Sequence, residues 1–234
     1  MTPPTDSAQG PVSYGAEPTW QLPDAVRRPL LLLPPLLIAL LEIFHPMPDE
    51  TAQAVMDVAT WFAAFHVIQL VLIGLVALSA VLLADSYGYA SAWTTRLGIG
   101  VFLVFFSAYD TLAGIGTGLA MRSARDLTTA QAEGVFSVVE DWPALGAPFA
   151  LSIAGTGGWL VAVGGLALAA RRRGAPRREW IFLALAAVLL MGGHPFPAGT
   201  LAFGCLFVAA LLREWPLARV AGARRGSTPD SRPG

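Results

Sequence analysis

The side chains best able to do chemistry in this sequence are a few acids, histidines and one glutamine set in otherwise apolar stretches. Glu42 and His45 are three residues apart, and so are His66 and Gln69, so each pair would share one face of a helix. Asp110 lies deep in another apolar stretch. Ionisable side chains at such positions are costly unless they face the interior of a helix bundle. These five residues are therefore the first candidates for a functional site.

Acid–base chemistry on a lipophilic molecule is one function that such residues predict. A carboxyl in a dry pocket tends to keep its proton, so Asp110 is the expected proton donor, with Glu42 or His66 as its partner. The reaction would be a protonation, isomerisation or cyclisation of a substrate such as an isoprenoid, and it needs no cofactor. The side chains expected to line the substrate pocket are Phe62, Gln69, Phe106, Tyr109 and His194.

Binding of a transition metal or haem is a first alternative. The Glu-x-x-His spacing of Glu42 and His45 is used by metal sites in helix bundles, and the expected ligands are His45, His66 and His194. Haem would need His66 and His194 as its axial ligands. A second alternative is an accessory or proton-coupled transport protein without catalytic activity. The sequence leaves open whether the protein is an enzyme.

The composition places these residues in a membrane protein. The chain has 234 residues, of which 55% are hydrophobic and only 13% are charged, and its mean hydropathy is +0.59. These values exclude an ordinary water-facing surface. All fifteen basic residues are arginine, which excludes a lysine Schiff base. The net charge of −1 gives no basic excess for nucleic acid, and the single cysteine cannot form an intrachain disulfide.

The predicted fold is an all-α integral membrane protein with polar tails at both ends. Residues 1–26 and 216–234 have the composition of disordered tails, and residues 27–215 form the transmembrane domain. About 20 helical residues cross a hydrocarbon core. The expected membrane spans are about 30–45, 58–84, 97–121, 146–170, 180–193 and 198–212.

The last two spans form a short hairpin, because the apolar stretch 180–212 is interrupted at Gly192–Pro197 by two glycines and two prolines. A six-span bundle puts both termini and nearly all arginines on the cytoplasmic side, as the positive-inside rule requires. We therefore expect a protein of a bacterial plasma membrane whose partners are the lipid bilayer and a lipophilic small molecule. The short arms place the turn below the outer surface, which predicts an outward-facing depression with His194 on its floor.

A short amphipathic helix is expected in the long outer loop between residues 122 and 145. Thr128 and Gln131 have the spacing of a capping box, and apolar residues follow at helical spacing. Trp142 would anchor this loop at the membrane interface. We expect the helix to lie flat at the outer face of the bundle.

Overall fold

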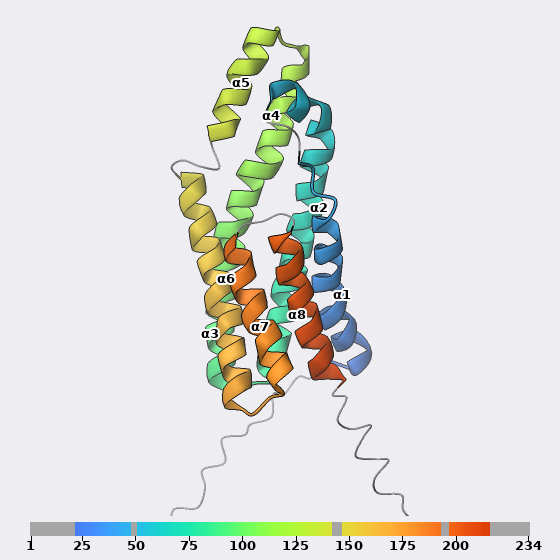
Figure 1. Cartoon of the computed structure of the whole chain (residues 1–234), viewed down its shortest axis with the longest axis vertical. Coiled ribbons are helices and arrows are strands. Elements are labelled where there is room, and N and C mark those ends of the chain that lie inside the picture. Colours follow the sequence, from blue (N-terminus) through green and yellow to red (C-terminus); the bar gives the residue numbers. More distant parts are fainter. Residues whose placement is uncertain (1–21, 48–50, 142–146, 193–196, 216–234) are drawn as a thin grey trace, which may run out of the picture.

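The computed structural model is helical throughout the part of the chain that it describes (Figure 1). No strand occurs in that part, which comprises residues 22–47, 51–141, 147–192 and 197–215. Three helices are long and apolar enough to cross a membrane by length and composition, namely Ala52–Asp85, Ala90–Asp126 and Phe149–Arg172. The all-α class and the presence of membrane-capable helices are thus confirmed.

Helices α1 (Asp24–Glu42) and α2 (Ala52–Asp85) form the first antiparallel pair. Helix α1 begins six residues before the expected start at residue 30; the carbonyl of Pro23 accepts its first backbone hydrogen bonds, and Asp24 supplies an acid to the first turn. It ends at Glu42, so His45 follows the helix instead of lying on its last turn. Helix α2 has 34 residues, about 51 Å at about 1.5 Å per residue, which exceeds a hydrocarbon core of about 30 Å.

The third apolar stretch contains a change of helix type. Helix α3 (Tyr89–Asp110) continues into the π-helical segment η1 (Thr111–Gly116), and α-helical geometry then resumes in α4 (Thr117–Ser123). A short 3₁₀ turn, η2 (Ala124–Asp126), closes the run. The π segment begins directly after Asp110.

Helix α5 (Thr129–Asp141) is the amphipathic helix expected in the outer loop. Gln131 accepts hydrogen bonds from the backbone N–H of Thr128 at 3.1 Å and from its hydroxyl at 2.9 Å, as the capping-box spacing predicts. Figure 1 shows α5 running back alongside α4, roughly along the long axis of the molecule. Helix α5 packs its apolar side against α2 and α4 in a small core that includes Val55, Met121 and Val139, and its expected place at the membrane interface stays a prediction.

The second half of the chain contains α6 (Ala147–Arg172), α7 (Arg177–Leu189), the 3₁₀ turn η3 (Leu190–Gly192) and α8 (Ala198–Glu214). Helices α7 and α8 are separate and pack side by side. Their upper ends stop well short of those of α2 and α4 (Figure 1). They are about 20 Å and about 26 Å long at about 1.5 Å per residue, as a short hairpin requires.

The main core lies between these helices, with α3 packed closely on α6. Close approach is possible because Gly98, Gly155 and Gly158 lack side chains. A Cβ atom at Gly155 would lie 2.7 Å from the backbone nitrogen of Phe106, and one at Gly158 would lie 2.6 Å from that of Phe102. The indole of Trp159 is fully buried and donates to the carbonyl of Ala186 at 2.9 Å, which joins α6 to α7.

Candidate functional site

His66 on α2 and Asp110 at the end of α3 face each other across the helix interface. Their side chains are only 3% and 1% exposed, and the Nε2 atom of His66 lies 3.9 Å from Oδ1 of Asp110. The Nδ1 atom of the same ring lies 2.7 Å from the carbonyl oxygen of Phe62. Because a carbonyl only accepts, Nδ1 carries the hydrogen, and in a neutral ring the Nε2 lone pair faces the acid. Nε2 of His66 and the carboxylate oxygen of Asp110 would then be two acceptors facing each other, unless one of them carries a proton.

The π segment η1 keeps the helix backbone close to this pair. Segments of this kind insert one residue into an α-helix and occur frequently at functional sites. Within η1, Gly114 is buried against the imidazole of His66, and a Cβ atom at Gly114 would lie 2.1 Å from the ring carbon Cδ2. One turn further on, Gly118 packs on the backbone of Ala63 in α2. The absence of side chains at both glycines lets the end of α3 approach α2.

Glu42 and Gln69 form a second buried contact, between α1 and α2. The amide nitrogen Nε2 of Gln69 donates to Oε1 of Glu42 at 2.9 Å, and both residues are almost fully buried. Gly199, in the first turn of α8, lies against the same carboxyl, since a Cβ atom there would be 3.0 Å from Oε2. The partial positive charge at a helix N-terminus favours a negative charge at this place.

The imidazole of His45 lies among aromatic rings of α2, next to His66. Its centroid is 5.2 Å from the ring of His66, 4.8 Å from that of Phe65 and 5.7 Å from that of Phe62. The ring of Phe62 in turn lies 4.6 Å from His66. The structure therefore brings the sequence-predicted residues of α1, α2 and α3 into one region.

The predicted pocket residues Phe106 and Tyr109 lie on α3 within one turn before Asp110, and the backbone of Phe106 faces Gly155 of α6. Phe106 is buried, stacks on Phe102 with ring centroids 5.0 Å apart, and approaches Tyr109 at 6.2 Å. His194, the remaining pocket residue and the third expected metal ligand, lies outside the described residues. The predicted depression with His194 on its floor therefore stays a prediction.

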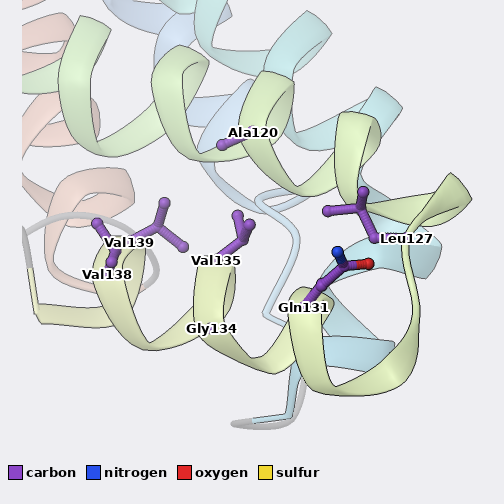
Figure 2. Close-up of a pocket in the computed structure, with 7 residues that line it drawn as sticks. All are labelled: Ala120, Leu127, Gln131, Gly134, Val135, Val138 and Val139. Carbon is purple, nitrogen blue, oxygen red and sulfur yellow. The ribbon is translucent and has the colours of Figure 1, made fainter.

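An open groove of about 410 Å³ lies elsewhere, between α4 and α5 (Figure 2). Valine side chains of α5, Ala120 of α4 and Leu127 of the α4–α5 connection line it, and Gln131 is its polar member. None of the residues predicted to form the substrate pocket belongs to it. The complete lining is Ala120, Leu127, Gln131, Gly134, Val135, Val138 and Val139.

The metal hypothesis has incomplete support in the described part of the chain. Among those residues, no group of three or more histidine, cysteine, aspartate or glutamate side chains is arranged to hold a metal ion. The ring of His66 is nevertheless oriented as in many metal sites, with Nδ1 bonded to a carbonyl and Nε2 directed elsewhere. The predicted ligand set of His45, His66 and His194 includes His194, which lies outside the described residues.

A buried acid that sequence analysis did not select lies at the opposite end of the bundle. Glu179 in the first turn of α7 is 1% exposed and accepts a hydrogen bond from the hydroxyl of Tyr87. The guanidinium of Arg213 lies 3.9 Å from Glu179 and stacks over the Tyr87 ring. Burial, followed by the hydrogen bond to Glu179, raises the pKa of Tyr87 far above its ordinary value. An acid after two arginines at a helix start resembles a solvated N-terminal turn, so its burial has no clear sequence signal.

The chain matches no protein-family model, no curated protein and no solved structure.

Proposed function

We propose that the protein is a six-span integral protein of a bacterial plasma membrane with both termini in the cytoplasm. Two observations support six spans: α7 and α8 are separate helices, and the start of α1 and the end of α8 lie at the same end of the bundle (Figure 1). Arginines concentrate at that end, which the positive-inside rule assigns to the cytoplasm. In this arrangement Glu42, His66 and Asp110 belong to the outer half of the bundle.

The proposed function is acid–base catalysis on a lipophilic substrate such as an isoprenoid. The observation that carries it is the pairing of His66 and Asp110, in which the imidazole lone pair faces a buried carboxyl at 3.9 Å. A pair of this kind holds one proton that either member can release. Asp110 would be the proton donor and His66 the proton acceptor.

An isomerisation needs only these two groups. The carboxyl of Asp110 gives its proton to one carbon of a double bond, which leaves a carboxylate and a substrate cation. Nε2 of His66 then removes a proton from a neighbouring carbon, so the double bond moves by one position. Between turnovers, His66 releases that proton to water and Asp110 takes up a proton from water, which restores the pair without any oxidant or cofactor. The ring of Phe62, whose centroid lies 4.6 Å from that of His66, would help to exclude water.

Deuterium labelling tests this function without knowledge of the substrate. The full-length protein in lipid nanodiscs is incubated in D₂O with a bacterial lipid extract, and the lipids are returned to H₂O and analysed by mass spectrometry. Wild-type protein should introduce deuterium at non-exchangeable carbon positions, and Asp110→Asn should reduce the incorporation at least about a hundredfold, as expected for loss of a general acid. Asp57→Asn, an exposed acid on α2, is the matched control and should retain full incorporation.

Elemental analysis and a visible spectrum of the same preparation separate acid–base catalysis from the metal alternative. A stoichiometric metal or a haem band that disappears in His66→Ala would replace the proposed proton transfer with ligation. Absence of deuterium incorporation by folded wild-type protein in lipid extracts would overturn the enzymatic proposal and favour an accessory or transport role. Asp110→Glu keeps the acid and serves as the second variant if Asp110→Asn does not fold.

A further inference from the structure

One end of the bundle contains three tryptophan–arginine pairs in which a guanidinium lies over an indole ring. They occur where α1 and α8 meet, at the start of α3, and where α6 connects to α7, all at the lower end in Figure 1. Such stacking holds an arginine side chain in place while its N–H groups stay available at the edge of the plane. The pairs are Arg28 with Trp215 at 5.4 Å, Arg96 with Trp93 at 5.8 Å, and Arg171 with Trp180 at 5.5 Å.

Only the third pair belongs to a region with a large excess of positive charge. Arg28 lies 3.7 Å from Glu214 and Arg96 lies 2.9 Å from Asp85, so acids offset these two arginines. The connection between α6 and α7 is different. The last turn of α6, the connection and the first turn of α7 together expose five arginines within eight residues, which we call the basic loop: Arg171, Arg172, Arg173, Arg177 and Arg178.

The basic loop receives no compensation from the acids that the structure describes. None of its five arginines forms an ion pair with a described carboxylate. The nearest acid in sequence, Glu179, is directed into the bundle, where it contacts Tyr87 and Arg213. The positive charge of the loop is thus free to act on a partner outside the protein.

We propose that the basic loop and Trp180 form a docking surface for the phosphate groups of anionic phospholipids. The basic loop begins in the last turn of the membrane-capable helix Phe149–Arg172, so its arginines lie where that helix would leave the hydrocarbon core. Tryptophan is enriched at this level of a membrane, and the guanidinium fork matches a phosphate better than an ammonium does. This inference concerns the end opposite the proposed acid–base site and does not depend on that chemistry.

The packing of Arg173 holds the basic loop against the turn between α2 and α3. Its guanidinium lies against Gly88 in the turn between α2 and α3, where a Cβ atom would collide with it. Gly88 has a φ of 93°, a conformation that favours glycine. Arg173 therefore anchors the loop to a neighbouring turn, and Arg171, Arg177 and Arg178 are the exposed positions chosen for the test.

Lipid retention measures this surface directly. The full-length protein is reconstituted in nanodiscs of phosphatidylcholine mixed with phosphatidylglycerol, released into detergent, and analysed by native mass spectrometry for bound lipid. Wild-type protein should retain phosphatidylglycerol in preference to phosphatidylcholine. Substitution of Arg171, Arg177 and Arg178 by glutamine should reduce that preference by up to about fivefold for each arginine removed, because a basic residue near an anionic surface contributes about 1 kcal/mol.

Two controls separate specific docking from general charge. Arg122→Gln removes one positive charge at the opposite end of the bundle and should leave the preference unchanged, whereas Arg177→Gln, which also removes one charge, should lower it. Lysine at the three positions keeps the charge but loses the planar fork, so it should restore part of the preference. Equal retention of phosphatidylglycerol by wild type and the triple glutamine variant would overturn the proposal, as would its displacement by millimolar inorganic phosphate, which would identify a site for the free ion.

Discussion

Gly114 illustrates how one residue determines the geometry of the candidate site. It stands in the π segment opposite His66, and the imidazole occupies the space that any larger residue would need. The ring has little freedom to move, since its Nδ1 atom is bonded to Phe62 and its other face contacts His45 and Phe65. The position of Nε2 relative to Asp110 thus depends on a residue that carries no functional group.

Substitution of Gly114 by alanine is expected to impair the site and the stability together. The added methyl group would lie 2.1 Å from the imidazole, so the ring or the helix must shift, at a cost of about 1–3 kcal/mol for overpacking. Thermal unfolding in detergent should show the loss, and deuterium incorporation should fall. Gly100→Ala on α3 is the matched control, because no atom lies within 4 Å of its added Cβ. It should raise stability by up to about 1 kcal/mol through helix propensity. Equal behaviour of the two variants would contradict the packing argument.

At the scale of elements, α5 packs beside α4 in a small core of its own, and its first turn is capped by Gln131. Only part of α5 is buried, and residues on its other side are exposed along the groove in Figure 2. Its attachment is reinforced by Arg125, whose Nε donates to the carbonyl of Met56 at 3.0 Å. An element held by so few contacts should open independently of the main core.

Removal of the capping residue should loosen α5 without unfolding the bundle. Gln131→Ala deletes the acceptor for the backbone N–H of Thr128, and loss of such a cap costs about 0.5–2 kcal/mol of local stability. Hydrogen–deuterium exchange should therefore accelerate in residues 129–141, while α2 and α6 keep their protection. Gln53→Ala, which removes an exposed glutamine from α2, should leave exchange in α5 unchanged. Uniform acceleration along the whole chain would show instead that α5 is part of the main cooperative unit.

The elements also show how far the sequence can predict this molecule. The helical arms on either side of residues 192–197 and the cap at Thr128 were predictable, because prolines, glycines and capping spacings act locally. The sequence indicated that His66 and Asp110 would each face the interior of the bundle, but it did not show that they face each other. The π segment was not predictable, since its extra residue is stabilised by packing between Gly114 and α2. The burial of Glu179 was likewise missed, because its partners Tyr87 and Arg213 are distant in sequence.

At the scale of the whole molecule, a polar network joins the elements at the end opposite the candidate site. Arg27 at the start of α1 lies 2.6 Å from Glu214 at the end of α8 and also donates to the hydroxyl of Ser86. Arg213 donates to the backbone oxygen of Ser86 at 3.2 Å and approaches Glu179 on α7. Because α8 contacts Glu42 at its other end through Gly199, this network fixes the helix that borders the candidate site.

Tyr87 in this network gives the whole molecule a predicted dependence on alkaline pH. Burial and the bond to Glu179 raise its folded-state pKa above the unfolded value of about 10. Below about pH 10 the hydroxyl is protonated in both states, so its contribution to stability is fully present. As the pH rises further, the unfolded chain releases this proton while the folded chain retains it, and stability falls. Because the chain has no lysine, few other groups obscure the effect. Melting temperatures are measured at pH values below and above about 10. Above that pH, the melting temperature should decrease more steeply with rising pH for wild type than for Tyr87→Phe. Parallel profiles would contradict the raised pKa of Tyr87 in the folded state.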